Sequence, residues 1–289
     1  MNQVIIAEAE NWLKRSSTLL GAQRASLAAV TPALMGMLSE SRARVVGLGG
    51  SPGTGKSTLA HLLRVVLAHQ GVKATVVSLD DYYLTRGERA RLAADVHPWF
   101  ATRGVPGTHD LGMLLSDLEG LLSGDTRNLV LPKFDKASDD RMSKRNPWQG
   151  PAPDIIMLEG WCIACPPLSL RDSATAINSA ERRRDPTGIW RDAVRGNLER
   201  YAKKLHPLLD LRWFMAAPDW DHVVLWRWQQ EQGLGERKRL SSRDEVRDFL
   251  AAYERLCRHM TATCEDWADS VIRLDRNHCT KLLHPGLNK

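Results

Sequence analysis

The sequence predicts an α/β protein built on a doubly wound, mainly parallel sheet, with a P-loop, helices on both faces and a helical lid near the C-terminal third. The first observation is a strand, a glycine-rich loop and a helix in succession between Val45 and Leu67. The second is that further short apolar runs alternate with segments of helical periodicity, the pattern of parallel strands joined by helices. The third is that polar residues follow these runs, where ligands of such sheets bind.

The loop from Gly50 to Ser57 reads G-x-x-x-x-G-K-S, the pattern of a phosphate-binding P-loop. Its glycines allow successive N–H groups to point inward, and the helix that starts near Gly55 adds the positive end of its dipole. Lys56 would reach the β- and γ-phosphates of ATP, and the Ser57 hydroxyl would hold Mg²⁺. A chance match is the alternative, and the flanking strand and helix argue against it. The predicted nucleotide-binding residues are Gly50, Ser51, Gly53, Thr54, Gly55, Lys56, Ser57 and Thr58.

The other elements follow from apolar periodicity. Strands are predicted at 73–79, 129–131, 154–158, 209–215 and 271–274, and helices at 3–40, 110–122, 219–232 and 243–263. Asp110 is the expected N-cap of its helix. The stretches 133–153 and 166–186 lack periodicity and are too long for simple connections, so functional loops are expected there.

The composition limits the classes of partner. The chain has 289 residues and a formal net charge of +6, which suits a small acidic substrate. It has no dense basic tract interleaved with aromatic residues, so nucleic acid is not expected. It also lacks a run near the ~20 apolar residues of a membrane span and a signal peptide, so a cytoplasmic protein is expected. Protein partners are not predicted.

The five cysteines are odd in number and scattered, which is typical of a reducing compartment. Cys162 and Cys165 form a C-x-x-C without a second matching pair. Buried thiols are the first interpretation, and a zinc or redox site is the alternative.

Carboxylates follow two of the predicted strands. Of Asp80 and Asp81, one would accept the proton of an attacking hydroxyl, and the other could bind Mg²⁺ through water or orient a neighbour. Helix or turn capping is the alternative. Glu159 is placed like a Walker-B acid near Mg²⁺, with a partnership to a loop arginine as the alternative. Metal contacts are therefore predicted for Ser57 and Glu159.

Cations are predicted to converge on an anionic acceptor. Each is more often a surface charge than a ligand, but together, beside strand ends, they favour an acidic substrate. The predicted contacts are Arg103, His109, Lys133 and Arg141. Arg227, with Arg237, Lys238 and Arg239 after a glycine-bearing break, would belong to a lid that closes over phosphates.

Long segments of the chain resemble a known family. They are Gly50–Ser57, Ser78–Thr85, Arg103–Asp110, Leu131–Ala137 with Arg141, Leu158–Cys162 and Trp226–Glu231. Their order and spacing resemble the D-glycerate 3-kinases of plants, fungi and bacteria, within the phosphoribulokinase/uridine kinase group of P-loop kinases. The resemblance implies transfer of the ATP γ-phosphate to the 3-hydroxyl of D-glycerate, with Asp80 as the base. Tyr82 stands where phenylalanine is common.

The resemblance extends from about residue 44 to residue 275. Residues 43–289 are therefore expected to form a P-loop kinase domain, and residues 1–42 an N-terminal helical segment of the same compact unit. The predicted catalytic residues are Lys56, Asp80 and Glu159, and Asp81 and Tyr83 are further substrate contacts.

Other functions remain open at this point. A P-loop kinase of another small alcohol, such as a nucleoside or a pantothenate-like compound, would share the nucleotide site. A GTPase or ATP-driven switch would ordinarily carry an [NT]-K-x-D segment, which the sequence lacks. A nucleic-acid-dependent ATPase would need a basic groove studded with aromatic residues.

Overall fold

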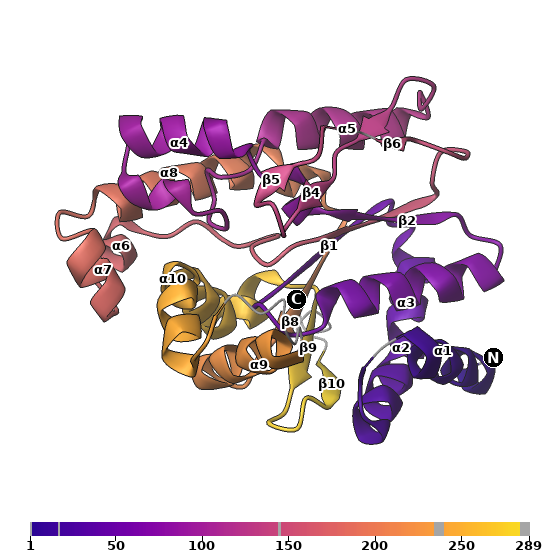
Figure 1. The fold of residues 1–289 in the computed structure, drawn as a ribbon. Helices are drawn as coiled ribbons and strands as arrows, with labels where there is room; N and C mark the ends of the chain where they lie inside the picture. The colour runs from indigo at the N-terminus through magenta and orange to yellow at the C-terminus, as the bar shows by residue number, and fades with distance from the viewer. Residues whose placement is uncertain (1, 17, 144–145, 234–239, 284–289) are drawn as a thin grey trace.

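The computed structural model describes residues 2–16, 18–143, 146–233 and 240–283 (Figure 1). The α-helices of these residues are α1 Asn2–Ser16, α2 Gly21–Ser41, α3 Lys56–His69, α4 Arg86–Asp95, α5 Leu111–Ser123, α6 Leu170–Ala174, α7 Ser179–Arg184, α8 Ile189–Lys204, α9 Trp220–Gly233 and α10 Arg243–Trp267. Short 3₁₀ helices are η1 Leu79–Tyr82, η2 Pro98–Ala101 and η3 His206–Leu208. The strands are β1 Val45–Gly50, β2 Ala74–Ser78, β3 Val130–Leu131, β4 Phe134–Asp135, β5 Asp140–Arg141, β6 Asn146–Pro147, β7 Ile155–Glu159, β8 Leu211–Ala216, β9 Ser270–Leu274 and β10 Thr280–Leu283.

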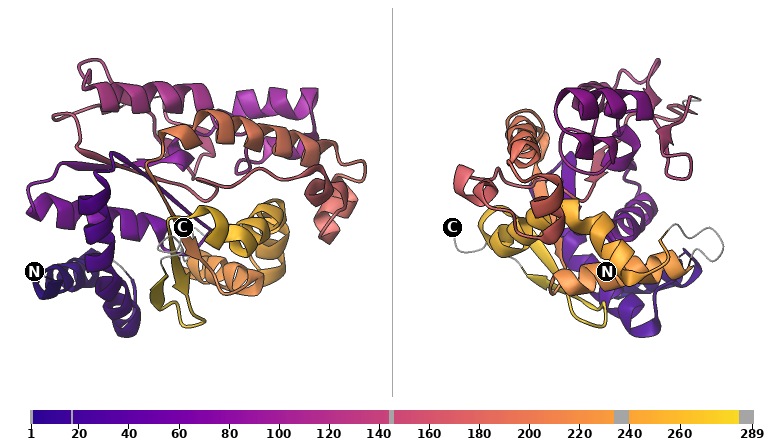
Figure 2. Two further views of the ribbon diagram at one scale, coloured as in Figure 1. Left: turned by 180° about the vertical axis from the view of Figure 1, so that it is seen from behind. Right: turned by 60° about the vertical axis from the view of Figure 1, so that its left-hand side comes forward.

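The central sheet has six strands in the order β10-β9-β8-β1-β7-β2. Strands β2, β7, β1, β8 and β9 are parallel, and β10 pairs with β9 in the antiparallel sense. Helices flank the sheet (Figures 1 and 2). The predicted α/β class with a mainly parallel, doubly wound sheet is therefore confirmed.

Two strands differ from the prediction. The run at 129–131 forms β3, which lies outside the central sheet and pairs with β6. The sheet does not end at β9, because β10 follows it as a hairpin partner. Polar residues from Asp275 to Thr280 interrupt the apolar pattern there, so the sequence gives no clear strand signal.

The strand register brings the expected polar residues to one edge. Strand β1 is buried along its whole length and lies between β7 and β8. Glu159, at the end of β7, is the Cα partner of Leu48 on one side and of Ser78 on the other. The P-loop after β1 and the acidic turn after β2 therefore meet beside Glu159.

The N-terminal helices share the core of the sheet. Leu13 of α1 and Leu34 of α2 are buried in the same hydrophobic cluster as β1. Helix α2 also contacts the β9–β10 hairpin, since Ser26 Oγ accepts a 2.9 Å hydrogen bond from the Thr280 N–H. No helix within the described residues combines the length and apolar content that a membrane span requires.

Helices α4 and α8 were not predicted from the sequence. Half of the residues of helix α4 are charged, and Arg89 is its buried residue. The Arg89 guanidinium donates hydrogen bonds to the carbonyls of Leu84, Ala101 and Asp139. These polar contacts hold α4 together with the packing of Leu92 against the core. Where the structure describes them, the two long stretches without periodicity contain short elements: β4, β5 and β6 in one, α6 and α7 in the other.

Candidate active site

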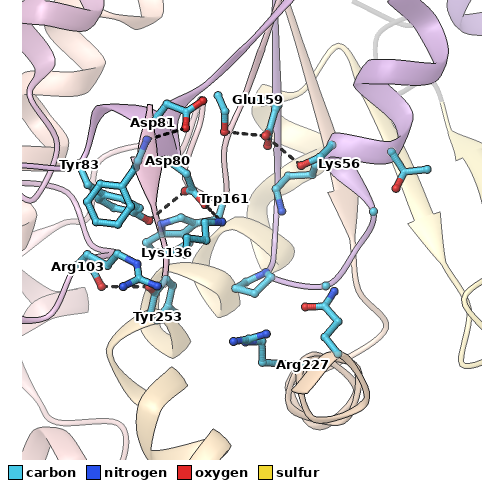
Figure 3. A pocket seen from close by; sticks show the side chains of 18 of the residues that line it. Lys56, Asp80, Asp81, Tyr83, Arg103, Lys136, Glu159, Trp161, Arg227 and Tyr253 are labelled. Atoms are coloured by element: carbon cyan, nitrogen blue, oxygen red, sulfur yellow. Dashed lines mark hydrogen bonds and ion pairs between the residues drawn. The ribbon is translucent and has the colours of Figure 1, made fainter. Parts of the chain in front are cut away.

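A cleft of about 780 Å³ lies at the carboxyl edge of β1, β7 and β2. The P-loop and the start of α3 form one end, and the segment after β2 forms the other, together with the β4–β5 hairpin (Figure 3). Helices α9 and α10 close one side. Among the lining residues are Gly53, Lys56, Ser57, Asp80, Asp81, Tyr83, Arg103, Lys133, Lys136, Glu159, Trp161, Arg227 and Tyr253.

The P-loop is already shaped for phosphate. Gly53 and Gly55 have φ angles of 84° and 91°, which residues with a Cβ rarely adopt. The Thr54 hydroxyl and the Lys56 ammonium each donate a 2.9 Å hydrogen bond to the Ser51 carbonyl. Burial lowers the pKa of Lys56, while Glu159 and Asp80 oppose that shift. Lys56 is thus buried beside two carboxylates, at the start of the helix whose dipole favours anions.

Ser57 and Glu159 meet as the Walker-type pattern predicts. Glu159 Oε1 accepts hydrogen bonds from Ser57 Oγ at 3.0 Å and from Ser78 Oγ at 2.8 Å. Mg²⁺ prefers hard oxygen ligands and keeps several waters, so it is usually held by one or two carboxylates plus substrate phosphates. A hydroxyl and a carboxylate beside the P-loop fit that ion. Within the described residues the hydrogen-bond partners of Glu159 are these two serine hydroxyls, and the loop arginine considered as the alternative is not among them.

Asp80 and Asp81 both reach the cleft from η1, but they hold different partners. Lys136 Nζ lies 2.6 Å from Asp80 Oδ2, and the Tyr83 hydroxyl donates to Asp80 Oδ1 at 3.0 Å. Lys133 Nζ lies 2.9 Å from Asp81 Oδ2, and the backbone N–H of Phe134 donates to Asp81 Oδ1 at 3.2 Å. Asp81 therefore anchors the backbone of the β4–β5 hairpin, whereas the partners of Asp80 in the described part of the chain are side chains.

His109 and Arg141 lie behind the cleft wall and do not line it. The His109 ring stacks on Tyr83 with centroids 4.4 Å apart, and its Nδ1 is 2.9 Å from the Tyr201 hydroxyl. Arg141 donates two hydrogen bonds to the Tyr83 carbonyl, at 3.1 and 2.9 Å. This differs from their predicted placement among the acceptor contacts: the His109 ring packs on the Tyr83 ring and Arg141 bonds the Tyr83 carbonyl, so both residues support Tyr83.

Arg103 does face the cleft, and its surroundings hold it in place. Its guanidinium pairs with Asp139 of the hairpin and lies over the Phe134 ring, 5.4 Å from the centroid. Its carbonyl accepts a hydrogen bond from the Tyr253 hydroxyl at 3.2 Å. The next residue, Gly104, has a φ of 140°, and a Cβ there would overlap the Tyr253 hydroxyl. A glycine is therefore required for α10 to approach this loop.

The predicted lid is described in part. Arg227 of α9 lines the cleft and forms an ion pair with Glu231 one turn later. Arg237, Lys238 and Arg239 lie outside the described residues. Gly53 of the P-loop packs directly under α9, since a Cβ there would lie 3.1 Å from the Trp226 Cβ. Helix α9 therefore contacts the nucleotide end of the cleft.

Sequence reasoning missed the aromatic side of the cleft. Phe249 and Tyr253 come from α10, one helical turn apart, and Trp161 follows β7. The Trp161 ring lies 4.7 Å from that of Tyr253, and its Nε1 donates to the Gly104 carbonyl at 2.7 Å. The four-residue spacing of Phe249 and Tyr253 was visible in the sequence, but an apolar helical face ordinarily indicates packing.

The C-x-x-C residues follow strand β7. The thiols of Cys162 and Cys165 are buried and free of disulfides. Burial raises the pKa of both thiols, so neither has the lowered pKa of a reactive thiolate.

This chain is similar to several known proteins. The family described as methylmalonyl Co-A mutase-associated GTPase MeaB matches residues 13–89, less than half of the chain. A protein named uncharacterized kinase mug58, from Schizosaccharomyces pombe, is 29% identical over 224 residues, which are 74% of this chain and 79% of that protein. The chloroplastic D-glycerate 3-kinase of Arabidopsis thaliana is 28% identical over 221 residues, which are 72% of this chain but 46% of the plant protein.

Among solved structures, the D-glycerate 3-kinase of Cryptococcus neoformans matches with a TM-score of 0.73 and 23% identity, over 89% of this chain and 98% of that one. This likeness shows a shared fold. The match to the GTPase family ends at residue 89, before the strand that carries Glu159, so it bears on the P-loop region alone. The comparisons therefore confirm the resemblance to the D-glycerate 3-kinases among the P-loop kinases, and they support a phosphotransferase of the kinase type.

Proposed function

We propose that this protein is an ATP-dependent kinase that transfers the γ-phosphate to the 3-hydroxyl of D-glycerate. The observation that carries the proposal is the arrangement of one cleft. The P-loop occupies one end, and Asp80 lies at the other end with the cations Arg103 and Lys136 (Figure 3). A phosphate donor and an acidic alcohol bound at these ends would meet beside Asp80. The relatives named D-glycerate 3-kinase support the choice of acceptor.

The nucleotide end would hold ATP through backbone amides of the P-loop. Lys56 would leave the Ser51 carbonyl for the β- and γ-phosphates, which offer a full charge in place of a neutral oxygen. Ser57 and Glu159 would hold Mg²⁺, which when bound offsets negative charge on the phosphates. Arg227 lines the same cleft and would add a cation from α9.

In the transfer, the acceptor hydroxyl oxygen attacks the γ-phosphorus. The new O–P bond forms as the bond to the β–γ bridging oxygen breaks, ADP leaves, and the hydroxyl proton passes to a carboxylate. We assign that role to Asp80, because Asp81 is engaged with the backbone of the hairpin. Asp81, Tyr83 and Lys133 would shape the acceptor end, and Arg103 would hold the carboxylate of D-glycerate.

The test is to incubate the protein with Mg-ATP and a panel of hydroxy acids, nucleosides and pantothenate, and to measure ADP formation. We expect turnover of D-glycerate, with ³¹P NMR showing the phosphate on the 3-oxygen. The Lys56→Ala variant, prepared identically, controls for contaminating kinases. Turnover of a neutral nucleoside or of pantothenate but not of glycerate would overturn the assignment of D-glycerate as the acceptor. The assignment as a kinase would still stand. ATP hydrolysis without a phosphorylated product would overturn the proposal that the protein is a kinase.

A further inference from the structure

Two lysines of the β4–β5 hairpin segment pair with the two adjacent aspartates of η1. Lys136 Nζ lies 2.6 Å from Asp80 Oδ2, and Lys133 Nζ lies 2.9 Å from Asp81 Oδ2. The lysine side chains are similarly exposed, at 63% and 56% respectively. The two pairs look alike, but only one of them contains the carboxylate that is assigned as the base.

The ion pair with Lys136 offsets the negative charge of the Asp80 carboxylate. Burial alone would raise the pKa of Asp80, but Lys136 and the hydroxyl of Tyr83 overcome this and hold that pKa below its usual value. A carboxylate stabilised in this way attracts the proton of an acceptor hydroxyl less strongly. Asp80 can therefore act fully as a base only when the Lys136 ammonium moves away from it.

Lys136 can leave its partner, whereas the neighbouring Arg103 keeps its ion pair with Asp139 while it faces the cleft. Arg103 is 16% exposed, paired with Asp139 and packed over Phe134. Lys136 is mostly exposed, and its ammonium sits on a flexible four-carbon stem. An anionic group placed beside Asp80 would compete for the Lys136 ammonium, while a neutral group would not.

We propose that Lys136 selects acidic acceptors by exchanging partners: it pairs with Asp80 in the free enzyme and with the acceptor's carboxylate when that acceptor is bound. An acidic acceptor thereby releases Asp80 to take the hydroxyl proton, while the new O–P bond forms and ADP leaves. A neutral alcohol of the same shape leaves Asp80 paired. The inference rests on the proposed function and adds a specificity-determining residue to it.

The experiment compares D-glycerate with D-glyceramide, in which a neutral amide replaces the carboxylate at nearly the same size. We would measure kcat/KM for both acceptors at saturating Mg-ATP in the wild type and in Lys136→Gln, Lys136→Arg and Lys133→Gln. In Lys136→Gln, kcat/KM for glycerate should fall by roughly 10- to 150-fold, the effect of losing a charge-assisted contact. The kcat/KM for glyceramide should fall little or rise. The ratio of kcat/KM for glycerate to that for glyceramide should therefore fall sharply.

The two other variants are the controls. Lys136→Arg keeps the charge and should retain most of the preference. Lys133→Gln removes the matched lysine from Asp81 and should retain the preference as well, whatever it does to overall turnover. Thermal unfolding of each variant checks that the exposed substitutions leave the fold intact.

The outcomes separate the two proposals. If Lys136→Gln lowers kcat/KM equally for glycerate and glyceramide, or if Lys133→Gln collapses the preference, the exchange of partners is overturned and the kinase stands. If the wild-type protein phosphorylates neither glycerate nor any other hydroxy acid of the panel, the proposed function fails, and the inference fails with it.

Discussion

Ser57 Oγ donates a 3.0 Å hydrogen bond to Glu159 Oε1, although the two residues lie 102 positions apart in the chain. The contact joins the P-loop helix to the end of β7, and Ser78 Oγ at the end of β2 donates to the same oxygen. Three neighbouring elements are thus joined at one carboxylate oxygen. An ion held by Ser57 would lie beside that charge.

Replacing Glu159 with Gln should weaken the dependence on Mg²⁺, because the amide keeps the shape and loses the charge. We expect the Mg²⁺ concentration for half-maximal activity to rise by about tenfold or more, the lower end for a lost charge-assisted contact. Titration of activity with Mg²⁺ at a fixed ATP concentration measures this half-maximal concentration. Ser78→Ala, which keeps the carboxylate, should shift the titration much less. An unchanged titration in Glu159→Gln would remove Glu159 from the ion site.

Asparagine substitutions should separate the roles of Asp80 and Asp81. Asp80→Asn should lower kcat by ~10²–10⁴, the usual effect of losing a general base, with little change in ATP affinity. Asp81→Asn should weaken the hydrogen bond to the Phe134 N–H, loosening the hairpin and raising KM for the acceptor more than it lowers kcat. Steady-state kinetics in both substrates measure the difference. A larger loss of kcat in Asp81→Asn would reverse the assignment.

Removing the guanidinium of Arg103 should weaken binding of the acceptor selectively. Arg103→Ala should raise KM for D-glycerate by roughly 10- to 150-fold and leave KM for ATP nearly unchanged, since Arg103 lies at the acceptor end. Arg103→Lys should restore binding in part, because a point charge lacks the planar fork of the guanidinium. The measurement is KM for each substrate at saturation of the other. Equal effects on both would indicate a phosphate contact.

His109 should make the folded protein sensitive to acid. Burial lowers the pKa of His109 to about 4, from an ordinary value of 6.5. Between these values the unfolded chain binds the proton and the folded protein does not, so the free energy of unfolding falls as the pH falls. This contribution reaches about 3 kcal/mol at pH 4. The glutamine of His109→Gln cannot be protonated, so the free energy of unfolding of this variant should depend less on pH between these two values.

The measurement is denaturant unfolding of the wild type and His109→Gln at several pH values from 7.5 to 4. The variant is expected to be less stable at pH 7.5, because the ring stacks on Tyr83 and contacts the Tyr201 hydroxyl. The difference between the two proteins should then shrink towards acid pH. A difference that stays constant over the whole range would contradict the buried, neutral state of His109.

Much of the nucleotide end could be predicted because its signals are local. The P-loop pattern, the apolar strand before it and the helix after it are contiguous in the sequence. The end of each predicted strand also indicates which polar residue follows it at the edge of the sheet. Asp80 and Glu159 were placed in this way, since parallel strands must bring their carboxyl ends to one edge. The N-cap role of Asp110 was predicted on the same local basis, and its side chain accepts the Met113 N–H at 3.0 Å.

By itself, then, the sequence determined the fold class, the P-loop and the order of the strand ends, because these depend on periodicity and on short spacings. Only the tertiary structure decided which loop cations face the cleft. His109 and Arg141 turn away to support Tyr83, while Lys136 pairs with Asp80. It also brought Tyr253 of α10 beside Arg103. The physical reason is that the direction of a loop side chain is set by partners far away in the chain, and no local pattern records them.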